Sequence, residues 1–132
     1  MSKSDDALSE FLFDDWLAGE FRDTEGFTAL VILVAISALE VMPLRSTFMH
    51  VIGDDLDWPG FTQLLRGAGV EWDGVVLFPV VDDDGGPLND AEARVQLAAY
   101  EKLVIENRLT INEGHFFDKW GRRMKIEEAQ AH

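Results

Sequence analysis

The sequence predicts an α+β protein, in which a small antiparallel sheet packs with four to five helices around a buried apolar helix over residues 28–42. Three features of the 132-residue chain lead to this prediction. Residues 27–42 are almost entirely apolar, residues 75–81 form a second apolar run, and strand-like segments follow helix-like ones without regular βαβ alternation. We expect one domain over residues 1–132, with a sheet of three to five strands and helices on one face. The alternative is a mostly helical protein with a terminal hairpin.

The run over residues 27–42 has two interpretations. As a helix it is rich in alanine, leucine and methionine, has Thr28 as its N-cap and meets Pro43 just beyond its end. As a strand it would use Val31 and Val34, but strands are usually about 5 to 6 residues long. The length favours the helix. A helix that is apolar on every side needs more cover than one small domain gives, so we also expect self-association or a partner.

Two further segments flank this run. The first is a helix with a cap at Ser4 or Asp5, which runs to about Ala18 and stops at Gly19. The second covers residues 45–52, where apolar side chains recur at helical spacing. Its β-branched members would also suit a strand.

A helix and the clearest strand of the chain come next. Asp57 precedes Pro59 and predicts the start of a helix that Gly67 ends. Residues 75–81 form a continuous apolar run and predict a strand. Because Pro79 has no backbone N–H, one side of that strand should be an edge or a bulge.

The last third of the sequence predicts a long helix and a C-terminal meander. Asn89 and Glu92 form a capping-box-like pair at the start of a helix that continues to about residue 107. Its apolar side chains form two rows: Val95, Ala99 and Leu103 in one, and Leu97, Tyr100 and Val104 in the other. A helix that is apolar on two sides should pack against two neighbours. Residues 108–112 then predict a strand, with turns over residues 112–114 and 118–121.

Acidic residues dominate the composition. The chain has 25 acidic and 11 basic residues, for a net charge of −14. Residues 1–113 carry 22 acidic and 7 basic side chains, whereas residues 114–126 carry 4 basic side chains and 1 acidic one. Free nucleic acid is a poor partner for such a surface, because its binding depends on Lys and Arg. A basic protein surface is a better partner, unless the acidic residues serve only to keep the protein in solution.

Two groups of residues are therefore candidates for partner binding. The acidic turns contribute Asp54, Asp55, Asp82 and Asp84, and the basic turn near the C-terminus contributes Trp120, Arg122 and Arg123. Exposed tryptophan beside arginine is typical of the energetic centre of a protein interface.

The sequence offers little for catalysis or metal binding. His115 and Asp118 are weak catalytic candidates, since an imidazole with an orienting carboxylate can act as a general base, although such pairs are usually surface hydrogen bonds. The acidic loops lack the ligand spacing of an EF-hand, so we predict no metal site, and leave open a weak divalent-ion site there. There is no cysteine, which fits a reducing cytoplasm and excludes thiolate chemistry.

Together these features favour a non-catalytic acidic interaction module that binds a basic protein surface, as a small subunit, an inhibitor or a nucleic-acid mimic. The alternative is a small hydrolase or metal-dependent enzyme that uses His115 and nearby carboxylates. We expect no cofactor, no direct binding of nucleic acid, and a cytoplasmic location, since the chain shows no export signal. We also expect no membrane insertion, because the apolar run is shorter than the about 18 residues that a span needs.

Overall fold

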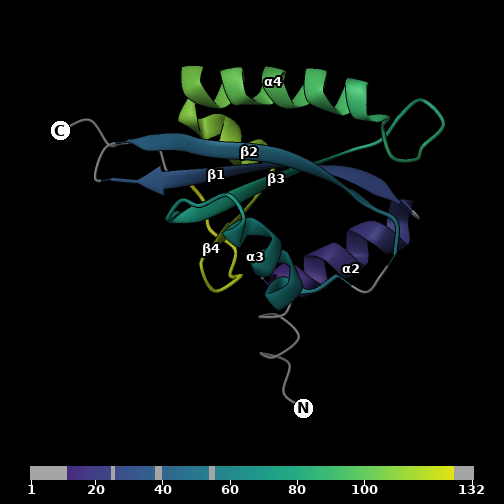
Figure 1. The fold of residues 1–132 in the computed structure, drawn as a ribbon, viewed down its shortest axis with the longest axis horizontal. Helices are drawn as coiled ribbons and strands as arrows, with labels where there is room; N and C mark the ends of the chain where they lie inside the picture. Colours follow the sequence, from purple (N-terminus) through teal and green to yellow (C-terminus); the bar gives the residue numbers. More distant parts are fainter. Residues whose placement is uncertain (1–11, 25, 38–39, 54–55, 127–132) are drawn as a thin grey trace, which may run out of the picture.

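A four-stranded antiparallel sheet in the order β2-β1-β3-β4 forms the centre of the protein. The computed structural model describes residues 12–24, 26–37, 40–53 and 56–126. The strands are β1 (Phe27–Ile36), β2 (Val41–Val51), β3 (Gly74–Val80) and β4 (His115–Asp118). The helices are α2 (Phe13–Thr24), α3 (Trp58–Arg66), α4 (Asp90–Glu106) and the 3-10 helix η1 (Arg108–Glu113). Helix α4 lies over one face of the sheet, and α2 and α3 lie under the other (Figure 1).

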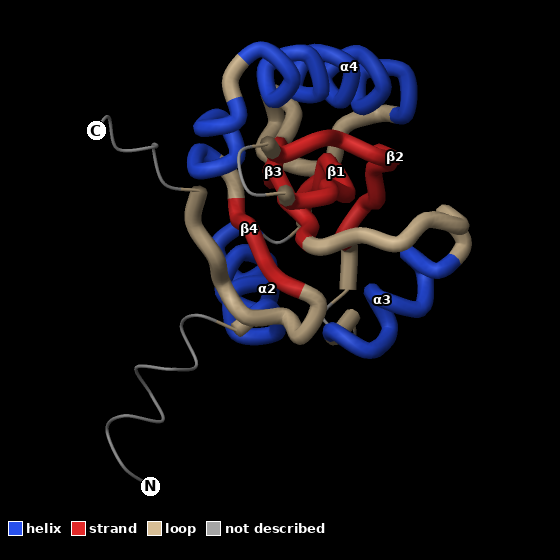
Figure 2. The backbone as a smooth tube through the Cα atoms, turned by 90° about the vertical axis from the view of Figure 1, so that its left-hand side faces the viewer, coloured by secondary structure: helices blue, strands red, loops and turns tan. Residues whose placement is uncertain are grey.

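The predicted α+β class is confirmed, but the helices cover both faces of the sheet instead of one. Figure 2 shows this layering from the side, with the strands between α4 and the pair formed by α2 and α3. The described residues contain three α-helices and one 3-10 helix. They contain no C-terminal meander, because β4 is followed by a turn and only isolated bridges, such as that between Phe117 and Arg123.

The helix predicted over residues 28–42 is wrong, because this segment belongs to a β-hairpin. Strand β1 pairs along its whole length with β2, from Phe27 opposite Val51 to Ile36 opposite Val41. A strand covered on both faces is apolar throughout and loses the alternation that marks a half-buried strand. Residues 28–42 instead contain most of β1 and the first two residues of β2, and the doubly covered β1 had the apolar composition of a buried helix.

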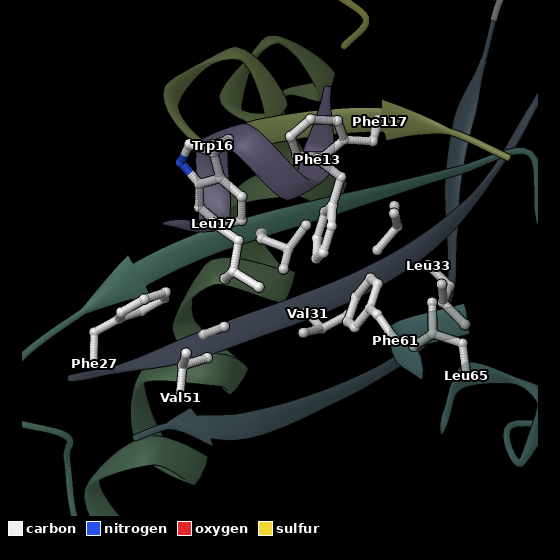
Figure 3. Close-up of a cluster of buried hydrophobic side chains, with 13 residues drawn as sticks. Phe13, Trp16, Leu17, Phe27, Val31, Leu33, Val51, Phe61, Leu65 and Phe117 are labelled. Carbon is white, nitrogen blue, oxygen red and sulfur yellow. The ribbon is translucent and has the colours of Figure 1, made fainter. Parts of the chain in front are cut away.

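Strand β1 is the most deeply buried element among the described residues. All eight residues from 27 to 34 are at most 2% exposed. Alternate side chains serve two separate cores: Val31 and Leu33 pack toward α2 and α3, and Leu30 and Ile32 pack toward α4. Figure 3 shows the first of these cores. Each fully buried side chain of this size stabilises the fold by about 1.5 to 3 kcal/mol, so β1, like β3 and β4, contributes to the stability of both cores.

Three further expectations differ from the structure. Residues 45–52 are not helical, and most of them belong to β2. Residues 108–112 form part of η1 instead of a strand, because the Asn107 side chain caps the segment by accepting a hydrogen bond from the Leu109 N–H. Gly19 does not end the first helix, since α2 continues to Thr24. The predicted start of that helix at Ser4 or Asp5 lies outside the described residues.

Other local predictions are confirmed. Asp57 caps α3 by accepting a hydrogen bond from the Gly60 N–H, and Asn89 caps α4 by accepting one from the Glu92 N–H. Strand β3 covers most of residues 75–81, and β4 pairs only with its residues 74–77. No strand of the described chain therefore pairs with Pro79 on that side, in agreement with the edge that its missing N–H predicted.

Helix α4 meets only one of its two expected neighbours in the described part of the chain. Leu97 and Val104 pack on the sheet with Leu30 and Ile32. The other apolar row faces outward, with Val95 65% exposed and Leu103 47% exposed. The row that had predicted a second packing partner is therefore solvent-exposed in the single chain.

Candidate functional site

The acidic loop and the basic turn lie at opposite ends of the sheet. At one end of β3, Gly74 pairs with Asp118, which leads into the basic turn over residues 118–121. At the other end, Val80 leads into the loop that contains Asp82 and Asp84. Seven strand residues span about 23 Å. The charge asymmetry of the sequence therefore becomes a separation in space.

The acidic end, as we name it, consists of the loop after β3 and the first turn of α4. Its members are Asp82, Asp83, Asp84, Asp90 and Glu92, all of which are exposed. The Asp82 carboxylate organises the loop, because its Oδ1 accepts hydrogen bonds from the backbone N–H groups of Asp84 and Gly86 at 2.9 and 3.0 Å. Five carboxylates without a basic neighbour in the same stretch create a strongly negative surface.

Asp54 and Asp55 follow β2, which ends on the same side of the sheet as β3, since both strands are antiparallel to β1. These two candidate residues lie outside the described residues. Asp57, the third carboxylate of that segment, caps α3. Within the described part of the chain, no group of three or more His, Asp or Glu side chains is arranged to hold a metal ion.

A hydroxyl, an imidazole and a carboxylate form a hydrogen-bonded chain beside the acidic end. Thr28 Oγ1 lies 2.9 Å from His50 Nδ1, and His50 Nε2 lies 2.8 Å from Asp90 Oδ1. Thr28 is completely buried and also accepts a hydrogen bond from the Leu88 N–H at 2.8 Å. The arrangement has the members of a hydrolase triad, but the hydroxyl is closed to a substrate and both imidazole nitrogens are occupied.

The sequence did not bring these three residues together, because they are separated by 22 and 40 positions. Thr28 and His50 are directly opposite each other in the β1–β2 pairing. The first turn of α4 then places Asp90 on the other side of the imidazole. The hydrogen bond from His50 is the main reason that the pKa of Asp90 is lowered.

His115 lies on β4 against α2, and no carboxylate of the described residues bonds to it as an orienting partner. Its ring stacks on Trp16 with centroids 4.5 Å apart, and its Nδ1 lies 3.0 Å from Arg123 Nη2. A guanidinium has only donors, so Nδ1 is the acceptor and the neutral ring carries its proton on Nε2. Burial, and then the charge of Arg123, lowers the pKa of His115 to about 4.

Asp118, the proposed partner of His115, is used to build the basic turn. Its Oδ1 accepts hydrogen bonds from the backbone N–H groups of Trp120 and Arg122, and its Oδ2 accepts one from Arg122 Nε. Side chains alternate along a strand, so His115 and Asp118, three residues apart, point to opposite faces of β4. The structure therefore does not bring the two catalytic candidates together.

The three candidate residues of the basic turn do not share one exposed surface. Trp120 is 69% exposed, and the Arg122 guanidinium lies over its ring at 5.1 Å. Arg123 instead points inward, over the Phe117 ring at 5.0 Å and against His115. Burial lowers the pKa of Arg123. Trp120 and Arg122 therefore form the accessible pair, and Arg123 is a structural residue of the α2 side.

A groove of about 390 Å³ opens beside the basic turn and adds residues that the sequence did not connect with it. Trp58 and Trp72 form an edge-to-face pair in this groove, with ring centroids 6.3 Å apart. Arg66 and Lys119 also line it. Gly121 has a φ of +78° and lies so close to Trp58 that a Cβ would be 2.9 Å from the indole ring, so only glycine lets the turn pack there.

Comparisons with known proteins do not extend these observations. No protein-family model, no curated protein and no solved structure matches the chain. Among the described residues, no helix is both long enough and apolar enough to cross a membrane. The function must therefore be argued from the surface and the site geometry.

Proposed function

We propose that the protein is a non-catalytic interaction module whose acidic end binds a basic surface of another protein. The observation that carries this proposal is the position of the five exposed carboxylates of the acidic end, on one loop and one helix start that share an end of the sheet. A concentrated negative surface attracts a basic partner and orients it before contact.

The geometry around the histidines supports a binding role over catalysis. A small hydrolase would need an accessible imidazole with a free nitrogen and an orienting carboxylate. Both nitrogens of His50 are occupied, and His115 contacts Arg123 and Trp16.

The test compares two variants that each lose three negative charges, in one case from the acidic end and in the other from elsewhere on the surface. The acidic-end variant combines Asp83→Asn, Asp84→Asn and Glu92→Gln. The control variant removes three exposed acids elsewhere, through Glu40→Gln, Glu106→Gln and Glu113→Gln. None of these changes removes a buried side chain, so both variants should fold like the wild type.

Each protein is immobilised and exposed at low ionic strength to an extract of the organism that encodes it, and bound proteins are eluted with salt and identified. We expect wild type and control to retain the same basic protein, and the acidic-end variant to lose it. Equal retention by all three proteins, or equal loss from both variants, would contradict a role for the acidic end as the recognition surface.

A further inference from the structure

Strand β2 forms one edge of the sheet, and no described strand pairs with its outer side. Exposed edges attract other strands, and proteins usually protect them with proline, charge or a bulge. In β2 this protection is concentrated near the hairpin, where Pro43 and a bulge opposite Leu33 and Val34 interrupt the register. The following segment, residues 45–50, has regular pairing with β1 and no acidic side chain.

The direction of the backbone groups in β1 determines which groups of β2 are free. In an antiparallel sheet, a residue that turns its N–H and C=O toward one neighbouring strand turns them away from the other. The Val34 carbonyl accepts a hydrogen bond from the Asp73 N–H, on the β3 side. Even-numbered residues of β1 therefore face β3, and odd-numbered ones face β2. Pro79 agrees, since it has no N–H to offer to Ala29 opposite it.

On β2, the residues opposite the odd-numbered ones of β1 are bonded to it, including Thr47 opposite Val31. The residues between them direct their backbone groups away from the sheet. These are Ser46, Phe48 and His50. The edge therefore presents three regularly spaced residues whose outward backbone groups can pair with an added strand, although the Phe48 carbonyl also accepts a long hydrogen bond from Thr47 Oγ1 at 3.5 Å.

A groove of about 420 Å³ with both apolar and polar lining runs beside this edge, between β2 and α3. Val31 and Leu33 line it below, and Leu64, which is 61% exposed, lines it on the α3 side. Arg45 also borders this groove and would repel a basic side chain. An added strand would thus place alternate apolar side chains here.

The opposite face of the same edge is suited to basic side chains. Ser46 donates a hydrogen bond to Glu101 Oε1 at 2.6 Å, which holds this α4 carboxylate next to β2. His50 holds Asp90 in the same way at 2.8 Å. Arg94 lies between them over Phe48, with its guanidinium 5.7 Å from the ring centroid. Two carboxylates and the Arg94 guanidinium between them therefore flank the edge on the α4 face, which leaves this face with a net negative charge.

We propose that β2 accepts an extended segment of the basic partner as a fifth strand, with apolar side chains in the α3 groove and Lys or Arg side chains toward Glu101 and Asp90. This inference rests on the proposed function and specifies how the partner docks. A second copy of the chain is a poorer occupant. In a two-fold pairing centred on Phe48, Ser46 would lie opposite the copy's His50. Glu101 would then lie close to the copy's Asp90, and the two like charges would repel each other. Each chain also carries a net charge of −14, which adds to the repulsion.

The experiment uses labelled peptides of about seven residues, a length that spans the free part of the edge. The first peptide alternates valine with lysine, and the second alternates valine with glutamate. The third contains the same valines and lysines as the first, grouped as one block of valine followed by one block of lysine. Binding to the full chain is measured by fluorescence anisotropy. We expect the alternating valine–lysine peptide to bind about tenfold or more tightly than either control, because only it matches both faces of the edge.

Protein variants then locate the binding site. Ser46→Pro removes an outward N–H, whereas Ser46→Ala leaves the backbone unchanged and loses only the contact with Glu101. Ala68→Phe fills the groove, and Gln63→Phe adds the same bulk to an exposed position of α3 outside it. We expect Ser46→Pro and Ala68→Phe each to weaken peptide binding by about tenfold or more, and the two matched changes to have smaller effects. Thermal unfolding checks that every variant folds. If Ser46→Pro fails to fold, Ala68→Phe still tests whether the peptide occupies the groove.

The outcomes separate this inference from the proposed function. If the peptide binds equally well to Ser46→Pro and Ala68→Phe but is lost from the acidic-end variant, the partner docks at the acidic end and the inference about β2 is wrong. If the wild type forms a dimer in sedimentation that Ser46→Pro dissociates, a second copy occupies the edge and the inference is also overturned. If neither the peptide nor any basic protein binds, both proposals fail.

Discussion

Thr28 connects four segments of the chain through one hydroxyl group. Its Oγ1 accepts a hydrogen bond from the Leu88 N–H, before α4, and meets His50 of β2, which in turn contacts Asp90 of α4. The bond from the Leu88 N–H is buried, so water cannot readily replace it if the hydroxyl is removed. A single oxygen atom therefore fixes the start of α4 against the β1–β2 hairpin.

Replacement of Thr28 by valine should destabilise the protein by about 1 to 3 kcal/mol, because the buried Leu88 N–H loses its acceptor while the side-chain shape is kept. Urea unfolding followed by circular dichroism measures the difference. Thr62→Val is the matched control, since the Thr62 hydroxyl bonds only to the Pro59 carbonyl within α3 and is part-exposed. An equal loss of stability in both variants would contradict the connecting role of Thr28.

His115 should remain neutral to unusually low pH. Because its folded-state pKa is about 4, well below the usual value near 6.5, the unfolded chain takes up a proton first as the pH falls. Its contribution to stability is therefore fully present above about pH 6.5 and is lost progressively toward pH 4. NMR titration of the three histidine rings measures this pKa directly.

Arg123→Gln provides the control for that titration. Burial is the larger cause of the low pKa and the Arg123 charge is the smaller one, so the substitution should raise the pKa of His115 only part of the way to its usual value. A His115 ring that titrates near pH 6.5 in the wild type would show that it is not held between Trp16 and Arg123.

At the level of elements, β1 contributes to both cores, and single substitutions along it should lower the free energy of unfolding by amounts that depend on how buried each residue is. Ile32 is completely buried and Ile36 is 39% exposed on the same strand. We expect Ile32→Ala to cost about 2 to 5 kcal/mol, the usual range for a large buried side chain, and Ile36→Ala to cost much less. Denaturant unfolding of the two variants measures the contrast, and similar costs would argue against the position of β1 between two helical layers.

The sequence predicted the elements whose signals are local. The caps Asp57 and Asn89, the strand after Gly74 and the turn from Asp118 to Gly121 each depend on residues within a few positions of one another. The β1–β2 hairpin was missed because cover on both faces removes the alternation that identifies strands. That cover comes from α4 and from α2 and α3, which is tertiary information that no window of the sequence contains.

The same limit applies to the candidate site. Acidic loops and a basic turn are visible in composition, and their placement at opposite ends of the sheet follows once the strand order is known. The chain from Thr28 through His50 to Asp90 and the pairing of Trp58 with Trp72 depend on contacts between distant segments. For His115 the neighbour in sequence, Asp118, was the wrong partner, because strand alternation turns it to the other face.

For the whole molecule, the uneven distribution of charge should control how fast a basic partner arrives. Long-range attraction raises the association rate constant at low ionic strength, and the gain should fall as the Debye length decreases from about 30 Å at 0.01 M to about 8 Å at 0.15 M salt. Stopped-flow association with the identified partner measures this dependence. The acidic-end variant should show a weaker salt dependence than the control variant, with little change in the dissociation rate.

An association rate that is indifferent to salt and to both sets of substitutions would contradict electrostatic steering. Binding would then have to depend on apolar contacts, and the exposed Val95 and Leu103 of α4 would be the first residues to replace.

The position of β1 between two helical layers also has a consequence during synthesis of the chain, because one of those layers is made long after β1. Its last residue, Ile36, leaves the ribosome long before the end of α4 at Glu106, and at about 5 to 20 residues per second this interval is about 4 to 14 s. Until then, the face of β1 that α4 will cover stays exposed on a nascent hairpin with a free edge, which is the kind of surface that aggregates or recruits chaperones.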